Sequence, residues 1–296
     1  MVFSALKLDS VNRATTTLDG IAGKAINVAK VLKVLGEKPF AVGFLGGPRG
    51  EDLRAALRVR GIEHEFVSVP VHTRQCITVI DEEAGTQTEL VEESLPVPSD
   101  AYKEMIEIVA RRLPSCNATV MSGTLTPAAP RDFYRQCIIL ANKASVLTIL
   151  DAKGEALEQA LDAKPALIKP NRAELSATLG RDLSEKQVLR DVVHALHDRG
   201  ARRVVVTAGK EPTVAFDGRQ FCRIIAPAIR AVNPIGSGDS FTAALTWRLL
   251  QGDDLAEACR WGAAAGAANA LTLMAAEVER EEVESLSRLV QVETLF

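Results

Sequence analysis

The stretch NPIGSGDSFTAAL, residues 233–245, places a glycine-rich turn in front of a segment rich in Ala and Leu. We expect that segment to be helical, and the free N–H groups and positive dipole end at the start of a helix attract anions. The residue that follows Gly236, Ser237 and Gly238 is nevertheless a carboxylate, Asp239. The turn therefore predicts an anion site with a negatively charged residue directly beside it.

Two common phosphate-binding motifs do not account for the glycines of this chain. A Walker loop that ends at Lys24 needs glycine at position 18 and Ser or Thr at position 25, where the chain has Leu18 and Ala25. A dinucleotide fingerprint that begins at Gly236 needs glycine at position 241, which is Phe241. Both motifs are excluded.

Short apolar runs alternate with helix-length segments in the second half of the chain. Runs rich in Val, Ile and Leu occupy 118–123, 146–151, 166–171 and 203–209, and the segment 131–143 between two of them has a helical pattern. Continuous β-branched runs between helices are typical of strands buried on both faces. The pattern predicts an α/β fold with a parallel sheet between two layers of helices.

The first third of the chain combines a helix and a strand of the same α/β type with a segment typical of an antiparallel hairpin. Residues 25–35 form one apolar helical face, and 39–47 are predicted to form a strand and a turn. Between 72 and 94, Thr, Val and Ile alternate with polar residues, which is typical of an antiparallel hairpin. We interpret about 1–18 and 65–98 as a small β lid on the α/β domain.

The composition narrows the class of protein. The chain is 47% hydrophobic and 25% charged with a net charge of −3, as in an ordinary soluble protein. It has no basic run and only 4% aromatic residues, which argues against nucleic-acid binding. There is no membrane-length apolar stretch and no signal peptide, and the five scattered cysteines suggest reduced thiols. We expect a cytoplasmic protein that acts on small molecules, not on nucleic acid or membranes.

Two segments near the ends of the chain resemble the two signature motifs of the ribokinase family, the PfkB carbohydrate kinases. They are AGKAINVAKVLKVLGEKPFAVGFLG (22–46) and NPIGSGDSFTA (233–243). The positions at the family's spacing are Gly23, Asn27, Ala29, Gly36 and Gly46 in the first motif and Gly236, Ser237, Gly238 and Asp239 in the second. The resemblance continues through TR (73–74), SGTL (122–125), KPNRAEL (169–175) and VTAG (206–209), and covers nearly the whole chain.

Several details resemble one branch of that family in particular. GFLGG, GTQTEL and KPN look like the 1-phosphofructokinases and tagatose-6-phosphate kinases. The resemblance implies a single ribokinase-like kinase domain over 1–296, with a central, mostly parallel sheet, helices on both faces and a small β lid. It also implies phosphorylation of a hexose phosphate (fructose 1-phosphate, tagatose 6-phosphate or fructose 6-phosphate) to a bisphosphate, with ATP and Mg²⁺.

The resemblance also gives the opening turn a chemical role. The family's matching Asp is the general base, which implies that Asp239 takes the proton of the attacking hydroxyl group. The backbone N–H groups of Ile235 to Gly238, with Ser237 between the glycines, would stabilise charge on the transferred phosphoryl group. The start of a helix stabilises an ionised carboxylate in its first turn. A simpler alternative is that Asp239 only caps the helix.

The resemblance assigns the sugar side of the site to two segments. Gly23, Lys24 and Asn27 would lie against the sugar at the start of the first helix. Arg74 would bind the phosphate that the substrate already carries, because a guanidinium group suits that contact, and Thr124 would assist with its hydroxyl group. The alternative for Arg74 and Lys24 is a solvated surface charge.

The nucleotide side is assigned to residues after two predicted strands. Asn171 and Glu174 are three residues apart and share a helix face. In the family the matching pair organises Mg²⁺, through water in the case of Glu174, and the triphosphate. Lys169 would contact a phosphate, and Thr207 and Gly209 match the nucleotide-side loop. Helix capping plus surface charge is the alternative for Asn171 and Glu174.

One family feature has no match in this sequence. Members usually begin with a strand that carries an NPALD-like stretch, whose Asp binds sugar hydroxyls, but LKLDSVNRATTTLDG already resembles the segment after it. Neither Asp9 nor Asp19 fits that motif, and Ala22 and Ala25 narrow the turn before the first helix. We therefore expect the chain as given to bind nucleotide but to phosphorylate sugar phosphates poorly.

Other functions and a partner remain open at this stage. A catalytically weak sensor of sugar phosphates or nucleotides is one alternative, although it would not need the base Asp239. A kinase of free sugars or nucleosides is another, and Arg74 argues against it. The uncovered face of the lid predicts a homodimer contact.

Overall fold

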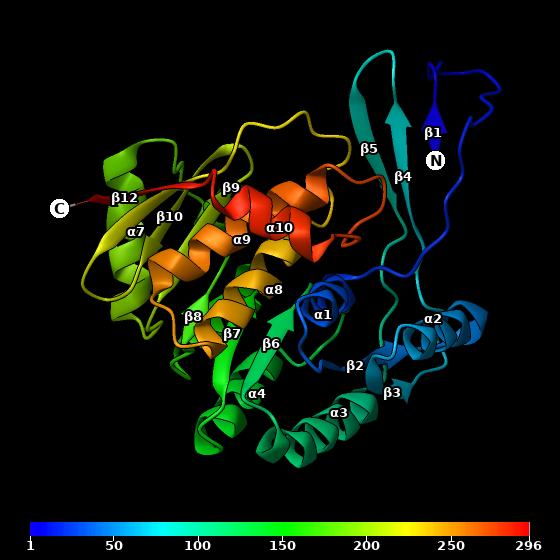
Figure 1. The fold of residues 1–296 in the computed structure, drawn as a ribbon. Coiled ribbons are helices and arrows are strands. Elements are labelled where there is room, and N and C mark those ends of the chain that lie inside the picture. Colours follow the sequence, from blue (N-terminus) through cyan, green and yellow to red (C-terminus); the bar gives the residue numbers. More distant parts are fainter. Residues whose placement is uncertain (296) are drawn as a thin grey trace.

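Three β-sheets organise the chain in the computed structural model, which describes residues 1–295 (Figure 1). The main sheet has the order β12-β11-β10-β9-β8-β7-β6, β2 pairs with β3, and β1, β4 and β5 form a third sheet. The strands of the main sheet are β6 (Ala118–Ser122), β7 (Leu147–Asp151), β8 (Leu167–Ile168), β9 (Val204–Ala208), β10 (Glu211–Phe216), β11 (Phe221–Ile225) and β12 (Gln291–Leu295). The others are β1 (Val2–Phe3), β2 (Phe40–Leu45), β3 (Glu63–Ser68), β4 (Cys76–Asp81) and β5 (Thr86–Val91).

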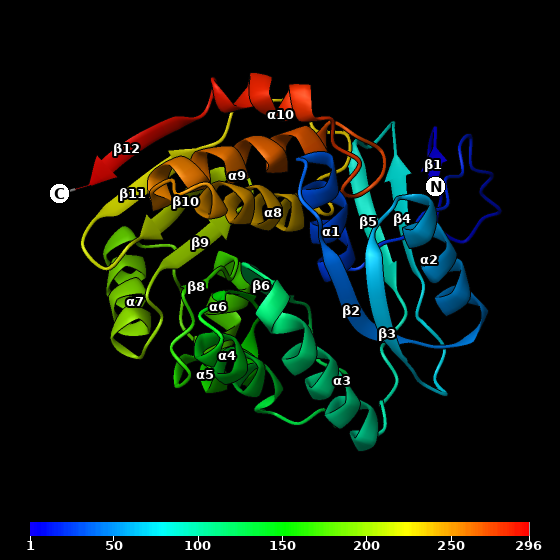
Figure 2. The same ribbon diagram turned by 60° about the horizontal axis from the view of Figure 1, so that its bottom comes forward.

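The helices cover both faces of the main sheet. They are α1 (Lys24–Val34), α2 (Gly47–Val59), α3 (Ser99–Arg112), α4 (Phe133–Lys143), α5 (Gly154–Leu161), α6 (Arg172–Leu179), α7 (Lys186–Asp198), α8 (Ser237–Leu250), α9 (Leu255–Ala270) and α10 (Arg280–Ser287), with a 3-10 turn, η1, at Leu113–Ser115. Figure 2 shows α1, α8, α9 and α10 on one side of the sheet and α3 to α6 on the other. Each side has its own buried apolar cluster.

The apolar runs explain the central strands. Strands β6 to β9 are parallel, and β10 to β12 continue the sheet antiparallel. Val204, Val205 and Val206 of β9 are fully buried, because helices cover both faces of the sheet at this strand. The prediction of an α/β fold with a central, mostly parallel sheet covered by helices on both faces is confirmed for β6 to β9, and the sheet continues through the antiparallel strands β10 to β12.

The main sheet and the β2–β3 pair are separate but adjacent. β6 ends the main sheet, and β2 is paired only with β3 within the described residues. Helix α1 packs against both β2 and β6, and Val42 and Phe44 of β2 belong to the same apolar core as Met121 of β6. Two sheet edges therefore lie in one packed region without pairing to each other.

The lid projects from the rest of the molecule (Figure 1). β4 and β5 form the antiparallel hairpin predicted within 72–94, and β1 pairs with β4 in parallel. Residues 65–68, which the sequence suggests for the lid, belong to β3 and pair with β2, so the lid sheet begins later in the chain. The amide of Gln87 donates to the carbonyl of Val232 at 3.2 Å and links β5 to the segment before α8. No helix within residues 1–295 is long and apolar enough to cross a membrane.

Candidate active site

The glycine turn before α8 has a conformation that few other residues adopt. Gly236 has a φ of 88°, in the left-handed region, and forms the N-cap of α8. A Cβ atom at this position would lie 2.8 Å from the Cβ atom of Ala275, closer than real Cβ contacts allow. Glycine is therefore required both by the backbone conformation and by the packing of this turn.

Two of the N–H groups expected to bind the phosphoryl group are used inside the turn. The N–H group of Ile235 donates to Oδ1 of Asn233 at 3.0 Å, and that of Ser237 donates to the carbonyl of Pro234 at 3.1 Å. The expectation that the N–H groups from Ile235 to Gly238 all face a ligand is therefore too broad. Gly236 and Gly238 remain the candidates for that contact.

A buried asparagine of α9 holds this turn from behind. The amide of Asn269 donates to the carbonyl of Ile235 at 2.9 Å and to Oγ of Ser237 at 3.1 Å, and its Oδ1 accepts from the N–H group of Ala276 at 2.6 Å. Asn269 is fully buried. The sequence analysis missed it, although a single polar residue in the alanine-rich run 262–270 was a usable signal.

Asp239 lies in the first turn of α8 and is only 6% exposed. Its Oδ2 accepts from the amide of Asn27 at 2.7 Å. Burial raises the pKa of Asp239 to about 6, with a further increase from the negative charge of Asp151, while the hydrogen bond from Asn27 and the ammonium groups of Lys169 and Lys24 lower it. A carboxylate with this pKa is ionised at neutral pH and still basic enough to take a proton.

Asn27 lies in the first turn of α1 and is buried beside Asp239. The resemblance placed this residue against the sugar, together with Gly23, which is the N-cap of α1 and has a φ of 129°. Within the described residues Oδ1 of Asn27 is buried without a hydrogen-bond partner. Its amide group holds Asp239 in place, so the start of α1 and the start of α8 form one unit.

Two lysines and Asp151 lie around Asp239, and Glu174 joins this charged cluster through Lys24. The ammonium group of Lys169 lies 3.2 Å from Oδ2 of Asp151, and both side chains are 3% exposed. Lys24 is 38% exposed and reaches Oε1 of Glu174 at 3.3 Å and Oδ1 of Asp151 at 3.9 Å. Burial lowers the pKa of Lys24, but the charges of Asp151, Glu174 and Asp239 outweigh that effect and leave the pKa above its usual value. Lys24 is therefore a cation of the site.

Asp151 is a member of this cluster that the sequence analysis missed. It is the last residue of β7, and Lys169 follows directly after β8, the next strand in the sheet. Polar side chains at the carboxyl ends of adjacent parallel strands lie at one edge of the sheet, where open α/β sheets bind ligands. The run VLTILD (146–151) carried the same signal as KPN, an ionisable residue at the end of an apolar strand.

Asn171 and Glu174 form a capping box at the start of α6. Oδ1 of Asn171 accepts from the N–H group of Glu174 at 2.8 Å, and Oε2 of Glu174 accepts from the N–H group of Asn171 at 3.3 Å. The other carboxylate oxygen of Glu174 contacts Lys24. Asn171 and Glu174 therefore do cap α6, as the alternative in the sequence analysis predicted. The carboxylate of Glu174 nevertheless lies beside Lys24 and so belongs to the charged cluster.

The chemistry of these donors fits Mg²⁺ only loosely. No group of three or more His, Cys, Asp or Glu residues within the described chain could hold a metal ion. Both oxygens of Glu174 already accept hydrogen bonds or an ion pair, which favours contact through water over direct coordination. Mg²⁺ that keeps several waters and binds chiefly to phosphate oxygens is compatible with such a site.

The proposed nucleotide segments lie side by side. Thr207 near the end of β9 forms a parallel bridge with Asn171, and its N–H group donates to the carbonyl of Pro170 at 3.2 Å. Gly209 follows with a φ of 61° in the left-handed region. The structure thus brings together Lys169, Asn171 and Thr207 from two neighbouring strand ends.

Arg74 and Thr124 are not part of this packed cluster. Both are exposed, Arg74 in the segment before β4 and Thr124 in the loop after β6. Arg74 forms no ion pair with a described residue. Thr124 lines a hollow of about 200 Å³, to which Arg131 and Lys153 also contribute.

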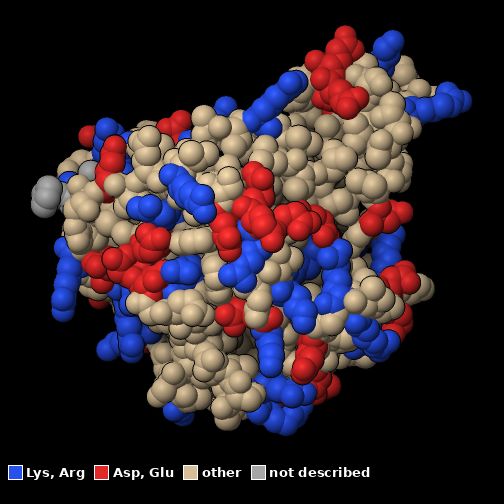
Figure 3. Space-filling view, viewed as in Figure 1, with Lys and Arg blue, Asp and Glu red and all other residues tan. Residues whose placement is uncertain are grey.

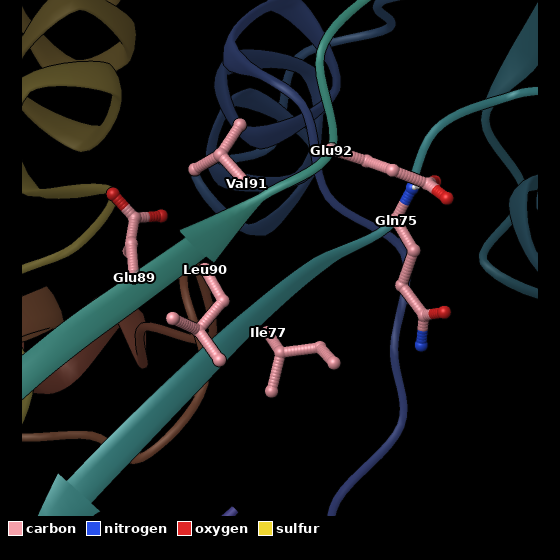
Figure 4. Close-up of a pocket in the computed structure, with 6 residues that line it drawn as sticks. All are labelled: Gln75, Ile77, Glu89, Leu90, Val91 and Glu92. Atoms are coloured by element: carbon pink, nitrogen blue, oxygen red, sulfur yellow. Dashed lines mark hydrogen bonds between the residues drawn. The ribbon is translucent and has the colours of Figure 1, made fainter.

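A larger hollow of about 500 Å³ lies on the lid, away from Asp239 (Figure 4). It is lined by Gln75, Ile77, Glu89, Leu90, Val91 and Glu92. Ile77 and Leu90 are cross-strand partners on β4 and β5, so their side chains share one face of the hairpin. Figure 3 shows that charged residues gather at the tip of the lid and that uncharged residues cover much of the lid surface below it.

The fold and this charged cluster together define an α/β phosphotransferase. Residues 2–280 match the family model described as pfkB family carbohydrate kinase. The match covers most of the chain, and the chain belongs to the PfkB family of carbohydrate kinases.

Solved structures of kinases share this fold. Phosphofructokinase-2 from Escherichia coli in complex with potassium is 28% identical, with a TM-score of 0.88 over 97% of this chain and 93% of that chain. The same enzyme in complex with fructose-6-phosphate is 28% identical, with a TM-score of 0.86 over 97% and 93%. A Thermotoga maritima protein described as a possible 1-phosphofructokinase is 21% identical, with a TM-score of 0.92 over 100% and 95%, and supports the fold alone.

Proposed function

We propose that this carbohydrate kinase transfers the γ-phosphoryl group of ATP to a hydroxyl group of a hexose phosphate and forms a hexose bisphosphate. The observation that carries the proposal is the buried Asp239 in the first turn of α8, hydrogen-bonded to Asn27 and flanked by Lys169. A carboxylate at this position can act on an acceptor hydroxyl group while the turn and the lysine stabilise the phosphoryl group.

The proposed reaction has one proton transfer and one exchange of bonds to phosphorus. Asp239 accepts the proton of the acceptor hydroxyl group, whose oxygen bonds to the γ-phosphorus as the bond to ADP breaks. The N–H groups of Gly236 and Gly238 and the ammonium group of Lys169 stabilise the negative charge on the transferred group. Mg²⁺, when bound, neutralises charge on the phosphate oxygens of ATP. Glu174 would orient its water ligands, and Asn171, Thr207 and Gly209 would border the nucleotide.

The phosphate of the acceptor is assigned to Arg74, assisted by Thr124. A guanidinium group binds a phosphate with two parallel hydrogen bonds, and Arg74 is exposed and has no carboxylate partner within the described residues. The phosphofructokinase-2 neighbour, whose structure was solved with fructose-6-phosphate, supports a phosphohexose as the class of acceptor. Fructose 6-phosphate, fructose 1-phosphate and tagatose 6-phosphate are the candidates.

A screen of ATP consumption over five acceptors tests this proposal. Fructose 1-phosphate, fructose 6-phosphate and tagatose 6-phosphate are compared with free ribose and adenosine at equal concentration, and product formation is followed by phosphorus NMR. We expect turnover with at least one sugar phosphate and little with the two acceptors that lack a phosphate. Faster turnover of ribose or adenosine would overturn the assignment of Arg74. Nucleotide binding without turnover of any acceptor would favour the sensor.

A further inference from the structure

A buried carboxylate with no role in the proposed reaction lies at the centre of the charged cluster. Asp151 ends β7, and its two oxygens face two different lysines: Oδ2 is 3.2 Å from the ammonium group of Lys169 and Oδ1 is 3.9 Å from that of Lys24. Its other side-chain contact is a long one of 3.5 Å from Oγ of Ser122. The lysine pairs therefore account for most of the environment of this carboxylate.

The two lysines come from different parts of the chain. Lys24 begins α1 and Lys169 follows β8. The ammonium group of Lys169 lies 3.8 Å from the point where a Cβ atom of Gly238 would be, so it borders the turn before α8. A lysine ammonium group sits on a flexible four-carbon stem, so a carboxylate partner restricts the positions that it can take. Asp151 is the carboxylate that both ammonium groups share.

We propose that Asp151 is a positioning residue, which holds Lys169 against the glycine turn and, together with the nearer Glu174, keeps Lys24 at the start of α1, so that Lys169 meets the phosphoryl group in a fixed place. This inference rests on the proposed function, because that function assigns Lys169 to the transferred phosphoryl group. Asp151 itself does not touch the substrates in this scheme. Burying the ionised carboxylate of Asp151 costs desolvation free energy, and its attraction to the two ammonium groups offsets that cost.

The same carboxylate repels the negative charge of Asp239. Four groups act on Asp239 across the cluster: Asp151 from β7, Lys169 after β8, and Lys24 and Asn27 from α1. Removing the charge of Asp151 therefore has two separable effects. The lysines lose their fixed positions, which slows transfer, and Asp239 loses a like charge, which makes it easier to ionise.

Replacing Asp151 by Asn tests both effects in the full chain. We expect kcat to fall about a hundredfold, as for a displaced catalytic group, while the acid limb of the pH profile moves to lower pH. The exposed Asp162, at the end of α5, provides the matched control Asp162→Asn. A variant with unchanged kcat would refute the positioning role, and an acid limb at or above the parent's pH would refute the electrostatic part of the inference.

A second variant separates positioning from folding. Asp151→Asn leaves Lys169 buried without its carboxylate partner, so it is also expected to lower the melting temperature. Combining it with Lys169→Met removes the unpaired charge, and we expect most of the melting temperature to return while kcat stays low. Because Lys169 is itself assigned to the phosphoryl group, kcat is read from Asp151→Asn alone, at temperatures below the onset of unfolding in its melting curve. A kcat equal to the parent's under those conditions, with only the melting temperature lowered, would mean that Asp151 serves folding alone.

The titration of Asp239 provides a readout that does not depend on turnover. Carbon NMR of the parent with labelled aspartate, assigned with Asp239→Asn, should follow the ionisation of this carboxyl group, and Asp151→Asn should move it to lower pH. If the parent phosphorylates none of the acceptors but this shift occurs, the proposed function fails and the electrostatic part of the inference stands. If the parent is active and no shift occurs, the inference fails alone.

Discussion

Around Asp239 most of the side chains that we propose for catalysis are buried and paired, whereas Arg74 and Thr124, which we propose for the sugar phosphate, are exposed. Asp239 accepts from Asn27, and Lys169 pairs with a carboxylate of β7. The exposed pair belongs to a loop and to the segment before β4, where no comparable hydrogen bonds fix the side chains. The two ends of one proposed site thus differ in how far the protein alone has arranged them.

This difference follows from what each end has to do. Groups that stabilise a transition state act best when they are held in place before the reaction, because no reorganisation is then needed. A group that captures a diffusing substrate can be ordered by that substrate, at a cost in binding free energy. We therefore expect changes near Asp239 to alter kcat and changes in the lid to alter KM.

The largest expected effect is that of Asp239→Asn. Removing a general base should lower kcat by about two to four orders of magnitude, while ATP, which is assigned to Lys169 and the α6 region, should still bind. Steady-state kinetics and a nucleotide-binding titration measure the two quantities, with the exposed Asp198→Asn as control. Turnover within a few-fold of the parent would reduce Asp239 to a helix cap.

Arg74→Ala should have the next largest effect, which we expect on KM for the sugar phosphate and not on kcat. Loss of a charge-assisted hydrogen bond to phosphate costs roughly 1.5–3 kcal/mol, or about ten- to a hundredfold in binding. We expect KM for the sugar phosphate to rise by that factor while KM for ATP changes little. Arg58→Ala, an exposed arginine of α2, is the control. An equal rise of both KM values would indicate general damage to the lid.

The pH dependence of kcat/KM should report the ionisation of the buried Asp239. Because burial raises the pKa of Asp239 to about 6, kcat/KM of the parent should fall about tenfold per pH unit below that value. A raised carboxyl pKa stabilises the fold at low pH, and this contribution is lost as pH rises through about 6. The melting temperature of Asp239→Asn, relative to that of the parent, should therefore be higher at pH 8 than at pH 4. A profile flat down to pH 4.5 would contradict the assignment.

The sequence predicted the strands and the ionisable residues around Asp239 better than the hydrogen bonds that join them. The apolar runs predicted β6, β7 and β9 to within two residues at each end, because burial on both faces imposes a continuous pattern. The sequence also identified Asp239, which follows a glycine turn, and Lys169, which follows a predicted strand. The pairing of Asn27 with Asp239 joins residues 212 positions apart, and no local pattern encodes such a partner. Asn269 stood out as a polar residue in an alanine-rich run, but that run did not reveal its contact with Ile235, 34 positions away.

An added strand should act on stability more than on the chemistry at Asp239. β6 and β2 both end their sheets near α1, so we expect a family-like strand with its Asp, fused before Met1, to pair with one of these edges. Each large side chain that it buries contributes roughly 1.5–3 kcal/mol. We expect a higher melting temperature, a lower KM for the sugar phosphate and unchanged nucleotide affinity. An unchanged melting temperature and an unchanged KM would contradict pairing of the added strand with either edge.

A fused strand of scrambled sequence and equal length is the control for this experiment. It adds the same mass but should neither pair with a sheet edge nor supply an Asp at the family's position. An equal rise in melting temperature with both fusions would mean that pairing with β6 or β2 is not the cause.

The smallest effect on catalysis is expected from the outer face of the lid. Leu90 is 55% exposed, lies opposite Ile77 and lines the hollow of about 500 Å³, whereas Gln87 on the other face contacts Val232. An uncovered apolar sheet face is a natural surface for a second copy of the chain. We expect Leu90→Lys to weaken a homodimer of the parent, as measured by sedimentation velocity over a range of concentrations.

The matched control is Val59→Lys, which places the same charge on an exposed valine at the end of α2. Turnover of Leu90→Lys at saturating substrate should stay within a few-fold of the parent, since Leu90 has no contact with the cluster around Asp239. KM for the sugar phosphate should rise modestly, because Arg74 shares the lid with this face. A parent that is monomeric at all concentrations would refute the lid dimer. A loss of kcat as large as that of Asp239→Asn would instead mean that the lid helps to arrange the catalytic groups, and the division between the two ends of the site would fail.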